Sequence, residues 1–240
     1  MAEIPHKGRG ATLNPTGRFE AAIRFATDDG WDTADPDFEP PALRTSVTED
    51  KSRTVIARNT SPDVGFDRSI NPYRGCEHGC VYCYARPSHA YLGLSPGLDF
   101  ESRLFAKSDA AQVLKRELTK PGYRCDVIAL GSNTDPYQPI ERERKITRSI
   151  LEVLAACDHP VSIVTKSALV LRDLDILAPM AERGLAAVMI SVTTLDRKLA
   201  RRMEPRAATG HYDPNSGRYT IHAGSGGTGA HSFRWALPIR

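Results

Sequence analysis

Three cysteines in one short stretch carry the clearest chemical pattern in this chain. Cys76, Cys80 and Cys83 follow the spacing C-x3-C-x2-C, so three thiols fall within eight residues. Thiolates this close on one loop can surround a small metal centre without ligands from distant segments, and Gly75 and Gly79 make that loop adaptable. Structural zinc sites close with four protein ligands, whereas three ligands leave one coordination position open. The spacing therefore favours an open iron–sulfur site.

Zinc is the main alternative for these thiols. A zinc ion would need a fourth ligand, such as His78, His89 or Cys125. Zinc motifs more often contain two separated cysteine pairs, and no second pair is found in this chain. Three unrelated core cysteines are less favoured still, because the Arg, Glu, His and Gly residues around them are not typical of a core.

The elements that would position the cysteine loop alternate in type along the chain. Short apolar runs predict strands, and the longer segments between them have the apolar spacing of helices. This alternation indicates right-handed βαβ units and a parallel sheet, in which the polar segments after the strands meet at one edge. The cysteine loop follows the first strand. The predicted strands are residues 68–71, 126–130, 161–165 and 186–192, the last three buried, and the predicted helices are residues 110–118, 146–157, 169–183 and 196–203.

The bulk composition is that of a soluble protein with one sizeable core. The chain has 240 residues, of which 40% are hydrophobic and 25% charged, with a net charge of +3. This charge permits nucleic-acid binding without indicating it. The five cysteines are too few for a disulfide scaffold, and we expect Cys125 and Cys157 to be buried core thiols. Neither a signal peptide nor an apolar run of about 20 residues is found, so a cytoplasmic protein is expected.

Composition also divides the chain into three parts. Residues 1–60 form a partly irregular N-terminal extension, whose first 50 residues are either a disordered arm or a strap lying on the domain. Residues 61–208 form the α/β core, and residues 209–240 form a glycine-rich, irregular tail. The glycines at 224–229 resemble a phosphate-binding loop only superficially, because no helix of useful length follows them.

The strings around the cysteines resemble the radical SAM superfamily. Its signature is a C-x3-C-x2-C run with an aromatic residue before the last cysteine, here Tyr82. Three longer strings are similar to the subgroup related to spore photoproduct lyase: NPYRGC at residues 71–76, YCYARP at 82–87 and TDPYQPIE at 134–141. The resemblance covers roughly residues 8 to 208 and is specific in several separated places.

The resemblance implies an enzyme with two cofactors. Cys76, Cys80 and Cys83 would bind a 4Fe–4S cluster, whose fourth iron takes the amino and carboxylate groups of S-adenosyl-L-methionine. The reduced cluster would cleave the sulfonium to give methionine and a 5′-deoxyadenosyl radical, which abstracts hydrogen from a substrate that the sequence does not identify. The implied partner is an electron donor of the flavodoxin or ferredoxin type. Nucleic acid enters only by analogy with the lyase, and no membrane is expected.

The resemblance also assigns the S-adenosylmethionine contacts. A zwitterionic ligand needs a cation for its carboxylate and hydroxyl or backbone groups for the rest. Lys166 fits the first need; it could instead be an ordinary surface lysine, but it directly follows a strand that we expect to be buried. The predicted contacts are Tyr82 beside the adenine, Ser132, Thr134 and Asp135 at the methionine end, Lys166 on the carboxylate, and Ser191 on the ribose or carboxylate.

Several charged residues near the motifs have two alternative roles. Glu141 and Asp135 could form an acid/base pair, although we favour one capping the following helix and the other orienting the loop. Arg74, Arg86 and His89 flank the cysteines and could bind an anionic substrate or remain solvated.

Two departures limit the likeness to the lyase. Ser132 stands where the lyase has its hydrogen-donating cysteine, and no cysteine lies between Leu130 and Glu141, so repair of thymine dimers is not expected. Related chains continue to a six-stranded partial barrel, whereas this chain changes character near Gly210. We therefore expect a partial parallel (β/α) barrel, incomplete at its C-terminus, and hypothesise a truncated or frameshifted gene product. The alternative function is a non-catalytic zinc or iron–sulfur protein, or an inactive fragment of such an enzyme.

Overall fold

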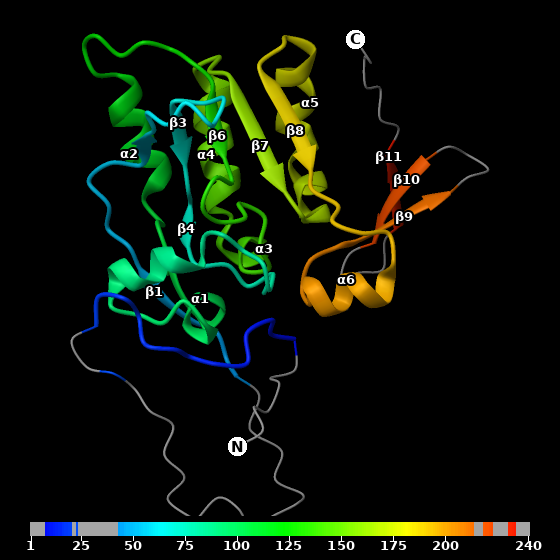
Figure 1. Cartoon of the computed structure of the whole chain (residues 1–240). Helices are drawn as coiled ribbons and strands as arrows, with labels where there is room; N and C mark the ends of the chain where they lie inside the picture. Colours follow the sequence, from blue (N-terminus) through cyan, green and yellow to red (C-terminus); the bar gives the residue numbers. More distant parts are fainter. Residues whose placement is uncertain (1–7, 21–22, 24–42, 214–217, 223–229, 234–240) are drawn as a thin grey trace, which may run out of the picture.

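A five-stranded sheet forms the centre of the computed structural model, which describes residues 8–20, 23, 43–213, 218–222 and 230–233 (Figure 1). The strand order is β2-β3-β6-β7-β8. Four strands run parallel in sequence order, and β2 pairs antiparallel to β3 at one edge. The strands are β2 (Ile56–Arg58), β3 (Arg68–Ile70), β6 (Ile128–Leu130), β7 (Val161–Thr165) and β8 (Ala186–Ile190). The predicted parallel α/β arrangement is therefore confirmed.

The register of the sheet stacks its apolar residues into one core. Ile70 pairs with Leu130, and Leu130 pairs with Ile163 on the next strand. All three are fully buried, because helices cover the sheet. α2 packs against α4, and α4 against α5 (Figure 1). Apolar residues of all three helices belong to the same core cluster as those of the strands. These helices are α2 (Ala110–Leu118), α4 (Ile146–Ala156) and α5 (Leu174–Glu182).

Two expected elements differ in detail. The helix predicted over residues 169–183 is divided into a 3₁₀ segment, η2 (Ala168–Asp173), and α5, where the buried Asp173 carboxylate binds Arg148 and Arg172. The fourth strand, expected to be buried, is half-buried and exposes Met189, because β8 is the last strand of the sheet and has a neighbour on one side only. Closure into a partial barrel stays a prediction.

A smaller three-stranded sheet supports the cysteine loop from below the main sheet (Figure 1). β5 lies between a parallel partner, β1, and an antiparallel partner, β4. Three short helical segments complete this end of the molecule. The elements are β1 (Ser46–Glu49), β4 (Tyr73–Arg74), η1 (Arg86–Leu92), α1 (Leu98–Ser102), β5 (Arg103–Ala106) and α3 (Glu141–Arg144).

The C-terminal part has more regular structure than the sequence indicated. Helix α6 (Arg197–Met203) lies where it was expected. From Thr209, where we expected an irregular tail, three antiparallel strands follow in the order β11-β10-β9. They are β9 (Thr209–Asp213), β10 (Arg218–His222) and β11 (Ala230–Phe233). The glycines of residues 224–229 lie outside the described residues. Within the described part of the chain, no helix combines the length and apolar character that crossing a bilayer requires.

Candidate functional site

The cysteine loop begins directly after β4 and turns at two glycines. Gly75 and Gly79 have φ angles of 82° and 69°, a left-handed conformation that strains other residues. The space is also closed, since a Cβ at Gly75 would lie 2.7 Å from a Leu104 methyl and one at Gly79 would lie 2.9 Å from Glu101 Oε2. Both glycines are therefore required by conformation and by packing, and they fix the path between Cys76 and Cys80.

All three thiols of the loop share one partly enclosed environment. Cys76 and Cys80 are buried and Cys83 is partly exposed. Burial raises the pKa of Cys80 and of Cys83, and the neighbouring Cys76 raises both further, whereas the Lys166 charge lowers that of Cys80. Thiols this close therefore ionise together only if a strong cationic centre stabilises the thiolates.

An iron–sulfur cluster suits this donor set. Among the described residues, no three His, Cys, Asp or Glu side chains converge on one point in a way that suits a single metal ion. A cubane cluster makes a different demand, because each thiolate binds its own iron and the three sulfurs stay apart. Cys76, Cys80 and Cys83, on one glycine-hinged loop, fit this demand.

A polar cluster from two strand ends lies beside the cysteine loop. Lys166, directly after β7, places its Nζ 2.9 Å from Ser191 Oγ, 3.1 Å from Thr193 Oγ1 and 2.8 Å from Glu204 Oε1. The same ammonium lies 5.6 Å from the ring centre of Tyr82, in the cysteine loop, and the Tyr82 hydroxyl contacts both Thr193 and Glu204. The structure therefore brings together Tyr82, Lys166 and Ser191, three of the predicted cofactor contacts.

Glu204 and Thr193 are members of this cluster that the sequence did not reveal as site residues. Burial raises the pKa of Glu204 to about 7, although the His78 charge opposes the shift. Burial also lowers the pKa of Lys166, and the charges of the nearby thiols oppose that effect. No local pattern marks Glu204, which follows α6 in sequence and reaches Tyr82 and Lys166 only through the fold.

The loop after β6 holds the cysteine loop from the inside. Asp135 accepts hydrogen bonds from Lys166 N at 2.8 Å and Thr165 Oγ1 at 2.7 Å, and pairs with His78 Nδ1 at 3.2 Å. Burial alone would lower the pKa of His78, but the charges of Asp135 and Cys76 raise it to about 10. The cationic His78 thus links the cysteine loop to the loop after β6. Asp135 has the loop-orienting role that we favoured.

Thr134 and Ser132 differ in how far they face the open side of the site. The Thr134 hydroxyl is buried and donates to Gly75 O at 2.7 Å, and Gln138 Nε2 donates to the same carbonyl at 3.2 Å. Ser132 is partly exposed and lies 3.0 Å from Asn71 Nδ2. Thr134 therefore supports the turn at Gly75. Direct contact of Ser132, Thr134 or Asp135 with a cofactor stays a prediction.

A sequence model of the Radical SAM superfamily matches residues 70–211. That match spans more than half of the chain and includes the cysteine loop and the strand-end polar cluster. The chain belongs to the radical SAM superfamily. No solved structure matches this radical SAM protein.

Its relatives are similar over only part of their length. An uncharacterized protein of Mycobacterium tuberculosis is 42% identical over 144 residues, which cover 60% of this chain and 42% of the relative. One from Methanocaldococcus jannaschii is 31% identical over 136 residues, covering 57% of this chain and 48% of that protein. One from Acidianus two-tailed virus is 28% identical over 172 residues, covering 70% and 54%. The radical SAM chain thus spans about half the length of these relatives.

Glu141 has a structural place in the radical SAM domain. Its fully buried carboxylate accepts hydrogen bonds from Thr147 N at 3.0 Å and Arg148 N at 3.3 Å, in the first turn of α4. It also accepts from Tyr73 Oη at 2.5 Å and pairs with Arg172 at 2.8 Å. The preferred expectation of a helix-capping role is confirmed, because backbone donors at a helix N-terminus are satisfied by this side chain.

The three basic residues that flank the cysteines are engaged within the protein. Arg86 pairs with the buried Glu101, and His89 is buried with its Nε2 2.9 Å from Arg103 O. Arg74 is exposed and pairs with Asp50 at 2.7 Å. The two alternatives raised for Arg86 and His89, an anion site or free solvation, are both replaced by internal contacts.

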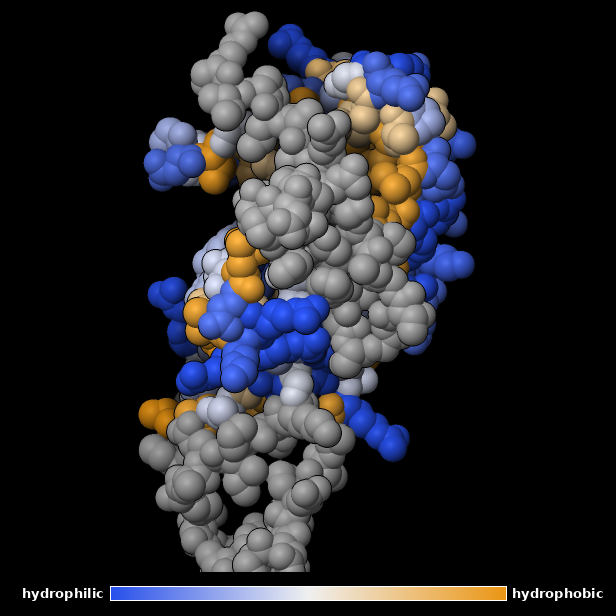
Figure 2. Space-filling model, turned by 90° about the vertical axis from the view of Figure 1, so that its right-hand side faces the viewer, coloured by the Kyte–Doolittle hydropathy of each residue, from blue (hydrophilic) through white to orange (hydrophobic). Residues whose placement is uncertain are grey.

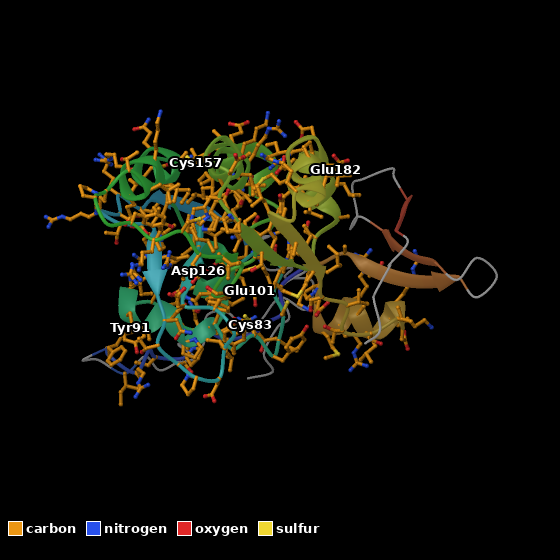
Figure 3. All side chains as sticks on the ribbon, turned by 90° about the horizontal axis from the view of Figure 1, so that it is seen from above. Cys83, Tyr91, Glu101, Asp126, Cys157 and Glu182 are labelled. Carbon is orange, nitrogen blue, oxygen red and sulfur yellow. The ribbon has the colours of Figure 1, made fainter. Side chains whose placement is uncertain are left out.

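The prediction that the two lone cysteines are buried is wrong. We expected Cys125 and Cys157 to be buried, but both are exposed, because Cys125 precedes β6 in a surface connection and Cys157 ends α4 on the outside of the helix layer. Figure 3 shows Cys157 among the outer helices, away from Cys83. Neither thiol belongs to the cysteine loop.

Glu101 ties an N-terminal segment across the cysteine loop. This fully buried carboxylate accepts hydrogen bonds from the backbone amides of Gly10 and Ala11, both at 2.9 Å, and pairs with Arg86. Arg9 donates to the Glu101 carbonyl and, at 2.9 Å, to Thr45 Oγ1. For residues 8–20, the strap alternative is therefore the one that the structure supports.

We expect Glu101→Gln to loosen this strap. The amide group offers one acceptor oxygen in place of two, which leaves buried donors unsatisfied at about 1–3 kcal/mol each. Tryptic cleavage between residues 8 and 20 should therefore become at least about tenfold faster, as measured by mass spectrometry under native conditions. Glu182→Gln, at an exposed position on α5, is the matched control and should leave the cleavage rate unchanged. Equal rates in the two variants would contradict the strap.

Proposed function

We propose that this chain is a radical SAM enzyme that binds a 4Fe–4S cluster through Cys76, Cys80 and Cys83 and holds S-adenosyl-L-methionine beside it. When bound and reduced, the cluster would supply the electron that cleaves S-adenosylmethionine, and the resulting 5′-deoxyadenosyl radical would abstract hydrogen from a substrate. The substrate is not assigned. Superfamily membership supports the reaction type, and the site supports the assignment of residues.

The observation that carries this proposal is the meeting of Lys166, Ser191 and Tyr82 beside the three thiols. These groups come from two strand ends and from the cysteine loop itself, and Lys166 Nζ lies 2.9 Å from Ser191 Oγ. A partly buried ammonium with hydroxyls around it suits an amino-acid carboxylate, since charge-assisted hydrogen bonds are the strong ones. We assign the carboxylate to Lys166, the adenine side to Tyr82 and a ribose or carboxylate contact to Ser191.

The remaining residues of the site have supporting tasks in this proposal. Ser132, partly exposed after β6, is assigned to the methionine end. Thr134 and Asp135 hold the loop after β6 against the cysteine loop, Thr134 through Gly75 O and Asp135 through His78. Positioning of this kind matters because a reactive radical must meet its target before it meets solvent or the protein.

Anaerobic reconstitution with iron and sulfide tests the proposal. We expect about four irons per chain with visible charge-transfer absorption, and 5′-deoxyadenosine after dithionite and S-adenosylmethionine are added. Lys166→Ala should keep its iron but bind S-adenosylmethionine at least about tenfold more weakly, because it loses a charge-assisted hydrogen bond. The exposed Lys120→Ala is the control and should match the wild type.

Two results would contradict the proposal. A colourless protein with stoichiometric zinc would identify a zinc site instead. A complete cluster without 5′-deoxyadenosine would identify a chain that binds iron without catalysing the reaction. Unchanged affinity in Lys166→Ala would leave the family intact but remove the assigned carboxylate contact.

A further inference from the structure

Helix α6 carries four exposed cations in seven residues. Arg197, Lys198, Arg201 and Arg202 are all exposed. No carboxylate of the described part of the chain forms an ion pair with any of them. Figure 2 looks at the side of the molecule on which α6 lies and shows strongly hydrophilic side chains gathered at its level. We call these four residues the α6 patch.

The α6 patch is unfavourable for its own helix. Arg197 and Arg201 are spaced i,i+4, as are Lys198 and Arg202, and like charges at this spacing repel each other. Arg197 and Lys198 also lie in the first turn, where cations oppose the helix dipole, whereas Arg201 and Arg202 lie in the last turn, where cations are favourable. Asp196 offsets part of this repulsion, because its carboxylate accepts a hydrogen bond from the amide of Lys198 at 2.8 Å. An anionic partner bound to α6 would reduce the remaining repulsion.

α6 is also fixed directly to the cysteine loop. Val81 N, between the second and third cysteines, donates to Met203 O at 3.0 Å. Just after the helix, Arg206 donates from its amide to His78 O at 3.2 Å and pairs with Glu77 at 2.9 Å. A molecule seated on α6 would therefore lie next to the iron–sulfur site.

Exposed aromatic and apolar side chains accompany the charges. Tyr84 is 77% exposed, and Val81 and Tyr82 are 49% and 47% exposed. All three belong to the cysteine loop and flank Cys83. Tyrosine and arginine are enriched at protein–protein interfaces, and small interfaces of this kind are typical of transient electron-transfer complexes.

We propose that the α6 patch, together with Tyr84, is the docking surface for an acidic one-electron carrier protein of the flavodoxin or ferredoxin type. This inference rests on the proposed function, which requires one electron. The carrier would lose one electron and the iron–sulfur site would gain it, with no bond made or broken. Charge complementarity would speed and orient the encounter, and the short path to the cysteine loop would favour transfer.

An acidic protein fits the α6 patch better than nucleic acid does. Seven helical residues span only about 10 Å. Proteins that bind single strands track the backbone over roughly 4–16 nucleotides, with several stacking aromatics along the groove. The patch is compact, and the hydroxyls of both neighbouring tyrosines are held within the protein, that of Tyr82 by Thr193 and Glu204 and that of Tyr84 by the Ser132 carbonyl.

Charge reversal on α6 tests the proposal. The variant is Arg201→Glu/Arg202→Glu, and its control is Lys115→Glu/Arg116→Glu on α2, which changes the net charge equally at exposed positions far from α6 (Figure 1). Fluorescence anisotropy measures binding of a labelled flavodoxin and a labelled bacterial ferredoxin at low salt. We expect the Kd to rise at least about tenfold in the α6 variant and to change little in the control, with a weaker salt dependence in the former.

A second measurement is the rate of electron transfer to the reconstituted protein. Reduction of the reconstituted protein by the carrier should slow by a similar factor in the α6 variant, while reduction by dithionite, a small reagent that needs no docking, should match the wild type. Circular dichroism verifies that both variants are folded. Failure to assemble a cluster would refute the proposed function, but the anisotropy experiment would still decide the docking surface.

Three results would overturn the docking proposal. One is the absence of binding of either carrier to the wild type. Another is an equal weakening of carrier binding in the α6 variant and in the α2 control, which would show that only the net charge of the protein matters. The third is α6-dependent binding of a labelled single-stranded 15-nucleotide DNA or RNA without α6-dependent carrier binding, which would assign the patch to nucleic acid.

Discussion

Replacing Cys76 with alanine is expected to abolish the proposed iron–sulfur site. Anaerobic reconstitution should leave less than about one iron per chain, compared with about four in the wild type, and the visible absorption and 5′-deoxyadenosine should disappear together. The physical reason is that Cys76, Cys80 and Cys83 are the three thiols of one loop, so two remaining thiolates cannot hold a cluster whose fourth iron has no protein ligand. The same loss is expected for Cys80→Ala and Cys83→Ala, measured by iron and sulfide analysis.

The chain supplies its own matched control for this experiment. Cys157→Ala removes an exposed thiol at the end of α4 and Cys125→Ala one before β6, and both should retain full iron content. Circular dichroism would show whether Cys76→Ala remains folded. Iron retained in Cys76→Ala would contradict the ligand assignment, as would iron lost in Cys157→Ala. Zinc bound by the wild type and lost in Cys76→Ala would identify the alternative metal.

Local patterns were enough to predict the four parallel strands of the central sheet. The apolar run at residues 126–130 and the one at 161–165 became neighbouring parallel strands, with Leu130 beside Ile163. Burial of β8 was overestimated because the number of neighbours a strand has is a property of the whole sheet. Hydrophobicity alone does not distinguish a central strand from the last one, and Met189 is exposed for that reason.

The site could be predicted where its residues lie in a motif or directly after a strand. Tyr82, Lys166 and Ser191 came from the family resemblance, and the structure brings them together because parallel strands end at one edge of the sheet; their contact with a cofactor stays a prediction. Glu204 and Glu101 could not be found, because neither stands in a pattern and each reaches its partners over a long sequence separation. Buried carboxylates that bind loops together become visible only when the loops are folded.

The second large effect concerns Glu141, whose replacement by glutamine is expected to lower the free energy of unfolding by about 3 kcal/mol. Its carboxylate is fully buried and binds Arg172, the Tyr73 hydroxyl and the first turn of α4. An amide cannot accept all of these hydrogen bonds, and it leaves the Arg172 charge without one of its two carboxylates. Because Arg172 is partly exposed and keeps Asp173, we expect the lower end of the usual 3–5 kcal/mol for a broken buried pair. Urea denaturation would measure this change in the free energy of unfolding.

Glu143→Gln separates this structural role from a general effect of removing a charge. Glu143 lies on the same short helix, α3, but is exposed, so the loss should stay within about 0.5 kcal/mol. Tyr73→Phe should destabilise less than Glu141→Gln, and the double variant should fall short of the sum, since both remove the same hydrogen bond. If Glu141 were instead an acid/base group, Glu141→Gln would lose 5′-deoxyadenosine formation with its unfolding midpoint unchanged. The contacts of Glu141 with backbone donors and with Arg172 favour the first outcome, because a carboxylate committed to four internal donors has no lone pair facing a substrate.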